Sequence, residues 1–66
     1  MKRARLISAI DVVCKTHTLV HKYAKSLIER GKVRINGVHV LDPYQMIENR
    51  RSISVKIGVT ENTYYV

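Results

Sequence analysis

Apolar residues in the first half of the chain recur every three to four positions, which is the spacing of an amphipathic helix. The first apolar stripe consists of Leu6, Ile10, Val13 and Cys14. It predicts a helix from about Arg3 to Cys14. The polar segment 15–18 then predicts a turn, in which Thr18 is suited to cap the N-terminus of a second helix.

A second helix is predicted by another apolar face, which consists of Val20, Tyr23, Ala24, Leu27 and Ile28. The polar residues of this segment fall on the opposite side: His21, Lys22, Lys25 and Glu29. Gly31 follows Arg30 at a position where a left-handed C-terminal cap is common. We therefore expect the second helix to stop sharply at Gly31.

After Gly31 the apolar period changes to that of a strand, since Val33 and Ile35 alternate with polar residues. Asn36-Gly37 is the dipeptide preferred in two-residue type I′ hairpin turns. Such a turn predicts that Ile35 faces Val38 and that Arg34 faces His39. The hairpin residues expected to face the helices are Val33, Ile35, Val38 and Val40.

Asp42-Pro43 ends this hairpin. We expect segment 44–47 to be a connection with Ile47 pointing inward, and segment 48–51 to be a turn. Alternating apolar residues predict a third strand, Ser52–Ile57, and residues 59–66 form either an extra edge strand or a tail. Residues 1–66 are thus expected to form a single α+β domain, with two N-terminal helices packed on a small, mostly antiparallel sheet.

The net charge of the chain is strongly positive, because 12 Lys and Arg residues stand against 5 Asp and Glu residues. Such a surface attracts polyanions. The single cysteine excludes an internal disulfide and fits a reducing compartment. No apolar run approaches the roughly 20 residues that span a bilayer. We expect a cytoplasmic protein that does not enter a membrane.

Catalytic and metal motifs are missing from the sequence. The acidic residues form no convincing pair, and neither a nucleophile elbow nor a phosphate loop is present. Cys14, His17 and His21 share one side only if a helix runs through the predicted turn, and one cysteine with three histidines would be an unusual zinc site. We expect a non-enzyme without cofactor or metal.

The sequences Ala24-Lys25-Ser26-Leu27-Ile28 and Gly31-Lys32-Val33-Arg34-Ile35-Asn36-Gly37 resemble the core of the S-four-type RNA-binding domain, or alpha-L motif. The resemblance runs without a gap from Val20 to Val55. It implies an RNA-binding surface on the second helix and the adjoining loop and strand. The residues at those positions are His21, Lys22, Lys25, Lys32 and Arg34. The chain departs from the family at Val20-His21, where Ser-Arg is usual, and at Arg50-Arg51, where Gly-Asp is usual.

Further cations extend this surface in the sequence: Lys15, Arg30, Arg50 and Arg51. Between Thr16 and Leu41 only Glu29 is negative, which favours phosphate contact over an ordinary solvated helix face. We therefore expect binding to structured RNA, ribosomal or otherwise folded. Tyr23 is expected to pack in or near the core, whereas Tyr44 and one of the terminal tyrosines are candidates for stacking on bases.

Two other functions fit the sequence. Two helices followed by a hairpin also describe a winged-helix DNA-binding regulator, although such proteins usually have a third helix. Alternatively, the chain is a small interaction protein that docks an acidic protein surface through the Arg50-Arg51 loop or the Tyr64-Tyr65 tail.

Overall fold

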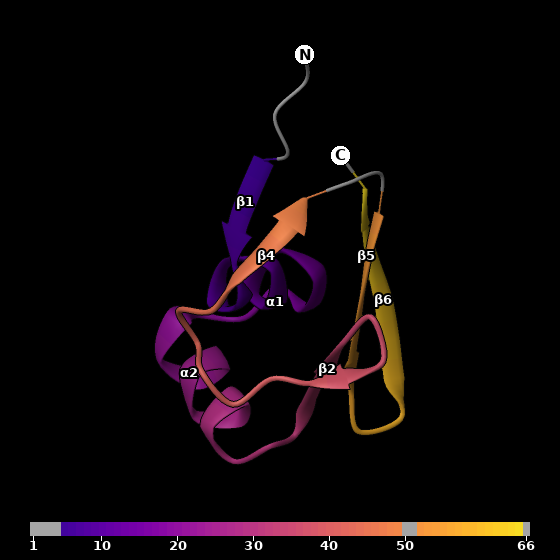
Figure 1. The fold of residues 1–66 in the computed structure, drawn as a ribbon. Coiled ribbons are helices and arrows are strands. Elements are labelled where there is room, and N and C mark those ends of the chain that lie inside the picture. Colours follow the sequence, from indigo (N-terminus) through magenta and orange to yellow (C-terminus); the bar gives the residue numbers. More distant parts are fainter. Residues whose placement is uncertain (1–4, 50–51, 66) are drawn as a thin grey trace.

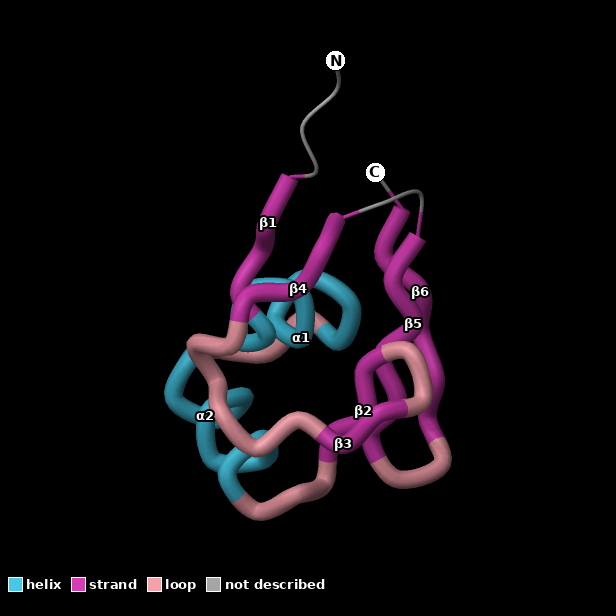
Figure 2. Tube along the Cα trace, viewed as in Figure 1, coloured by secondary structure: helices cyan, strands magenta, loops and turns pink. Residues whose placement is uncertain are grey.

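The computed structural model describes residues 5–49 and 52–65, which form two helices and two antiparallel sheets (Figures 1 and 2). The elements in chain order are β1 (Arg5–Ser8), α1 (Ala9–His17), α2 (His21–Glu29), β2 (Val33–Ile35), β3 (Val38–His39), β4 (Met46–Asn49), β5 (Ser52–Ile57) and β6 (Thr60–Tyr65). Strand β1 pairs with β4, and the larger sheet has the order β3-β2-β5-β6. The predicted α+β class is confirmed.

The first helix begins later than the apolar stripe predicts. Residues Arg5–Ser8 form β1 instead, in which Ile7 lies opposite Ile47 of β4. Ser8 is the N-cap of α1, because its Oγ accepts a hydrogen bond of 3.3 Å from the N–H of Asp11. The prediction was wrong because Leu6, which the helical stripe included, is a strand residue that is 58% exposed. The start expected at residue 3 lies outside the described residues.

Helix α1 also continues through the segment that was predicted to be a turn. The Thr16 hydroxyl donates a hydrogen bond of 2.9 Å to the carbonyl of Val12, so this polar side chain is satisfied within the helix. The chain turns at Thr18, whose φ of 52° lies in the left-handed region. Thr18 therefore ends α1, and the prediction that it caps the second helix is wrong. The N-cap of α2 is Val20, which provides no side-chain hydrogen bond.

The predicted second helix and its stop are confirmed. The N–H of Lys32 donates to the carbonyl of Leu27, and the N–H of Gly31 donates to the carbonyl of Ile28, both at 3.0 Å. This pair of bonds is the Schellman motif, which requires a left-handed residue directly after the helix. Gly31 supplies it with a φ of 73°. The chain consequently leaves α2 in a fixed direction and enters β2.

The hairpin that follows also forms as predicted. Asn36-Gly37 adopts φ values of 52° and 81°, as a type I′ turn requires. Ile35 lies opposite Val38 and Arg34 lies opposite His39, which confirms the predicted register. The expected burial of Val38 is wrong, since its side chain is 63% exposed. Strand β3 is the short strand at one edge of the larger sheet, and the helices do not cover this edge (Figure 2).

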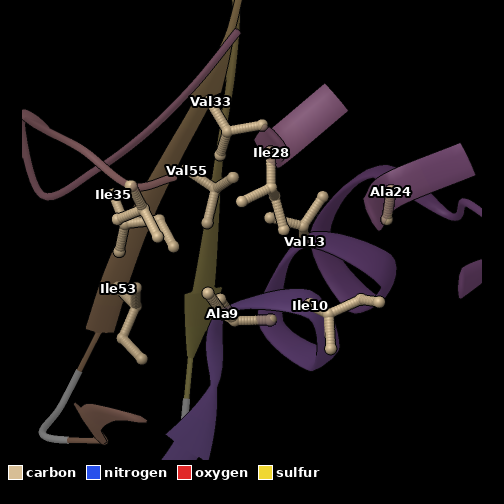
Figure 3. Packing of buried hydrophobic residues seen from close by; sticks show 11 residues of the cluster. Ala9, Ile10, Val13, Ala24, Ile28, Val33, Ile35, Ile53 and Val55 are labelled. Carbon is tan, nitrogen blue, oxygen red and sulfur yellow. The ribbon is translucent and has the colours of Figure 1, made fainter. Parts of the chain in front are cut away.

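The hydrophobic core lies between the two helices and one face of the larger sheet (Figure 3). Its buried residues are Ala9, Ile10, Val12, Val13, Ala24, Ile28, Val33, Ile35, Val40, Ile53 and Val55. Successive strand residues point to opposite faces of a sheet. The face turned away from the helices therefore carries Arg34, between two buried residues of β2, and Lys56, which follows buried Val55 in β5.

Two segments near the C-terminal end are strands. Segments 44–47 and 48–51 were expected to be a connection and a turn, but Met46–Asn49 forms β4 and pairs with β1. Ile47 is partly buried against the core, as predicted, and residues 50–51 lie outside the described residues. Of the two alternatives for residues 59–66, the structure shows the edge strand, because Thr60–Tyr65 pairs with β5.

Candidate nucleic-acid interface

The outer face of the larger sheet carries a row of nitrogen-bearing side chains across three strands. Arg34 of β2 lies opposite His39 of β3 on one side and opposite Lys56 of β5 on the other. Directly opposed residues in an antiparallel pair have Cβ atoms about 4.5–5.5 Å apart and share a face. Two residues of the β2–β3 hairpin and one residue of the distant strand β5 are therefore brought side by side on the solvent side of the sheet.

Arg34 is held in place within this row. Its Nε–H donates a hydrogen bond of 3.0 Å to Nε2 of His39. Because arginine keeps all its N–H groups, Nε2 of His39 is the acceptor of this bond. The bond uses one of the five N–H donors of the guanidinium group. Within the described residues the other four have no partner, so they are available to a ligand.

A groove of about 310 Å³ opens beside this row. Its lining residues are Gly31, Lys32, Arg34, His39, Lys56 and Gly58. None of these described lining residues is acidic, and none of their cations forms a salt bridge with a described acid. Glu61 lies opposite Lys56 in the register and keeps its charge, but its carboxylate accepts a hydrogen bond of 2.8 Å from the Ser54 hydroxyl and does not line the groove. The groove lining therefore contains three cations and no described acid.

A second hollow, of about 360 Å³, lies on the exposed side of α2. It is lined by Val20, Lys22, Tyr23, Ser26 and Arg30. Arg30 is the C-cap of α2 and Lys32 follows two residues later, with the left-handed Gly31 between them. Hence consecutive residues line the α2 hollow and the sheet groove where the helix passes into β2, and a short segment of chain joins the cations Arg30 and Lys32.

Three other predicted site residues, Lys25, His21 and Lys15, line neither of these two hollows. Lys25 is exposed on α2 but lines neither of them. His21 pairs with Asp11 of α1 through an Nε2–Oδ1 distance of 3.3 Å. Lys15 lies with its Nζ 5.9 Å from the ring centre of Tyr64, which is partly buried on the helix side of the sheet. Lys15 and Lys56 are thus on opposite sides of the sheet. Arg50 and Arg51 fall outside the described residues.

Three features of the interface were missed by the sequence reasoning. Lys56 was seen only as a polar position in a strand, and its place beside Arg34 depends on a pairing of distant segments. His39 was predicted to face Arg34, but it was not counted among the site residues. The packing expected for Tyr23 is wrong, because its side chain is 56% exposed. The exposure of Tyr23 could have been predicted from the sequence, because Tyr23 and the charged Arg30 occupy neighbouring positions of the α2 helical wheel.

Cys14 has a different environment from these exposed groups. It is half-buried against the core. Desolvation on burial raises the pKa of its thiol, and the nearby Asp11 carboxylate raises that pKa further. A thiol with a raised pKa remains protonated at neutral pH and is a poor nucleophile. This fits a structural role in the core.

The described part of the chain shows neither a metal cluster nor a membrane-spanning helix. Among residues 5–49 and 52–65, no three His, Cys, Asp or Glu side chains gather closely enough to hold a metal ion. Neither helix in these ranges has the length and apolar character needed to cross a bilayer. No protein-family model matches this chain, and no curated protein matches it in sequence.

Proposed function

We propose that the protein is a cytoplasmic, non-catalytic RNA-binding module that holds the phosphate backbone of a folded RNA, ribosomal or otherwise. The observation that carries this proposal is the sheet groove, which is lined by the cations Lys32, Arg34 and Lys56 together with His39, and by no described acidic residue. Positive side chains gathered in one groove attract a polyanion more strongly than the same charges spread over the surface.

Arg34 is the central residue of this proposal. A guanidinium group binds phosphate through two parallel N–H bonds, and the bond to His39 already restricts its orientation. Lys56 contributes a point charge beside it on β5, and Lys32 contributes another two residues before it in the chain. Lys22 and Arg30 in the α2 hollow continue the positive surface, so a nucleic-acid backbone that crosses the end of α2 contacts both hollows.

RNA is favoured over DNA for two reasons. The sequence between Val20 and Val55 resembles the S-four-type RNA-binding domain. In addition, a helix that reads DNA places its exposed side chains in the major groove. Here the cations are divided between α2 and the outer face of the sheet, an arrangement that suits the irregular surface of a folded RNA recognised by shape and phosphates.

Filter binding with a folded fragment of ribosomal RNA over a series of salt concentrations tests the proposal. If about five cations contact phosphates, the plot of log affinity against log salt has a slope of about −3 to −5. Failure to retain the RNA, or a slope near zero, overturns it. Competition with duplex DNA of equal length separates RNA from DNA binding. Pull-down after nuclease treatment shows whether an acidic protein is the partner instead.

A further inference from the structure

Tyr23 lines two hollows that differ in their charged residues. On one side it lines the α2 hollow together with Lys22 and Arg30. On the other side it lines a smaller hollow of about 210 Å³ between the ends of both helices and the larger sheet. The other lining residues of this smaller hollow are His17, Leu19, Leu27, Ile57 and Thr60. One exposed aromatic ring thus lines both a hollow that contains two cations and a hollow that contains no lysine or arginine.

The smaller hollow has an apolar floor and a polar rim. Leu19, Leu27 and Ile57 are partly buried and pack against the core, so the floor is held by the rest of the fold. At the rim, Nε2 of His17 lies 3.5 Å from the carbonyl oxygen of Thr60, which links the end of α1 to β6. Flat ligands with apolar faces and polar edges fit such a site, because the floor desolvates the faces and the rim bonds the edges.

Packing does not account for Tyr23. More than half of its side chain is exposed, at 56%, and its hydroxyl has no hydrogen-bond partner among the described residues. A buried tyrosine in a structural role usually pairs its hydroxyl and buries its ring. An exposed, unpaired ring on a rigid helix, in contrast, offers a stacking surface that costs little conformational entropy on binding.

We propose that Tyr23 stacks on one unpaired base of the bound RNA. This base enters the smaller hollow, while its adjoining phosphate lies against Lys22 and Arg30. This inference rests on the proposed function and narrows it, because the RNA must then contain a loop or bulge with an accessible base. A nucleotide has a flat base and a charged phosphate joined by a short sugar, which matches the two hollows on either side of the ring.

Two RNA hairpins with the same stem test the inference, one with an all-adenosine loop and one with an abasic loop of equal length. Both carry the same number of phosphates, so a difference in affinity reports the bases. By fluorescence anisotropy, wild-type protein is expected to bind the adenosine loop about tenfold more tightly. Tyr23→Leu should bind both hairpins equally, and Tyr23→Phe should keep the preference.

Met46→Leu is the matched control, since Met46 is 52% exposed, about as much as Tyr23, and lies outside both hollows. It should keep the tenfold preference. If wild type binds neither hairpin, the proposed RNA-binding function itself fails. If wild type binds both hairpins equally with a steep salt dependence, RNA binding stands and base stacking at Tyr23 is rejected. If Tyr23→Leu lowers the affinity for both hairpins by the same factor, so that the tenfold preference remains, stacking is likewise rejected and the ring has a structural role.

Discussion

Arg34 Nε lies 3.0 Å from His39 Nε2, across a hairpin that places these two residues directly opposite each other. The Asn36-Gly37 turn sets this register, because both of its positions adopt the positive φ of a type I′ turn. A long arginine side chain loses rotamer freedom when it binds a ligand. Since the bond to His39 already restricts it, His39 is a positioning residue for the cation at the centre of the groove.

His39→Ala is expected to lower RNA affinity about fivefold, because immobilising an arginine side chain that is no longer held in place costs about 1 kcal/mol on binding. The measurement is filter binding of the folded RNA fragment at constant salt and pH. In an Arg34→Ala background the same substitution should change affinity little, since the group that His39 orients is gone. An undiminished fivefold loss in that background would show that His39 contacts the RNA by itself.

Lys56→Ala should make the salt dependence of RNA binding shallower by about one unit of log–log slope, since it removes one phosphate contact from the groove. Lys15→Ala removes the same charge from the helix side of the sheet, beside Tyr64. It should leave the slope unchanged. Salt titrations of the two variants against wild type decide the matter. If both variants change the log–log slope equally, RNA binding depends only on the net charge of the protein, and the groove is not the binding site.

The elements that the sequence predicted correctly are those specified by neighbouring residues. Helix α2 has its own apolar face and its stop at Gly31, and the Schellman bonds form within that segment. The β2–β3 hairpin is set by a two-residue turn, so the Arg34–His39 pair follows from local turn chemistry alone. Strand β5 follows from strict alternation around Ile53 and Val55.

The parts that were predicted wrongly depend on distant segments. Leu6 fits a helical stripe with Ile10, but pairing with β4 places it in a strand. One local signal marked the boundary, since Ser8 followed three residues later by Asp11 is a helix-start pattern. The position of Lys56 in the groove had no such signal. It depends on which strand β2 pairs with, and alternation within β5 carries no information about that choice.

Thr18→Gly is expected to stabilise the protein, because Thr18 ends α1 with a φ of 52° that is unfavourable for a β-branched residue. Release of left-handed strain of about 1 kcal/mol should raise the melting temperature by about 4–8 °C in a domain of this size. Circular dichroism during heating measures the melting temperature of each variant. Thr18→Ala is the control and should not give this increase, since alanine keeps the left-handed penalty. A lower melting temperature for Thr18→Gly would show that flexibility in the unfolded chain outweighs the strain.

Cys14 should make the stability of the protein fall at alkaline pH. Burial, aided by Asp11, raises the pKa of the folded-state thiol above the ordinary value of 9.0. The folded state therefore holds the proton more tightly than the unfolded state. This contribution is fully present below pH 9.0 and is lost as the pH rises through the folded-state pKa.

Urea unfolding of wild type and Cys14→Ser at neutral and alkaline pH isolates this effect, because serine does not titrate and the other titrating groups are common to both proteins. Wild type should lose more unfolding free energy than Cys14→Ser as the pH rises above 9.0. Iodoacetamide should also alkylate Cys14 more slowly in the native protein than in urea, since the thiolate is the reactive form. Equal alkylation rates and parallel pH profiles would place Cys14 in solvent rather than against the core.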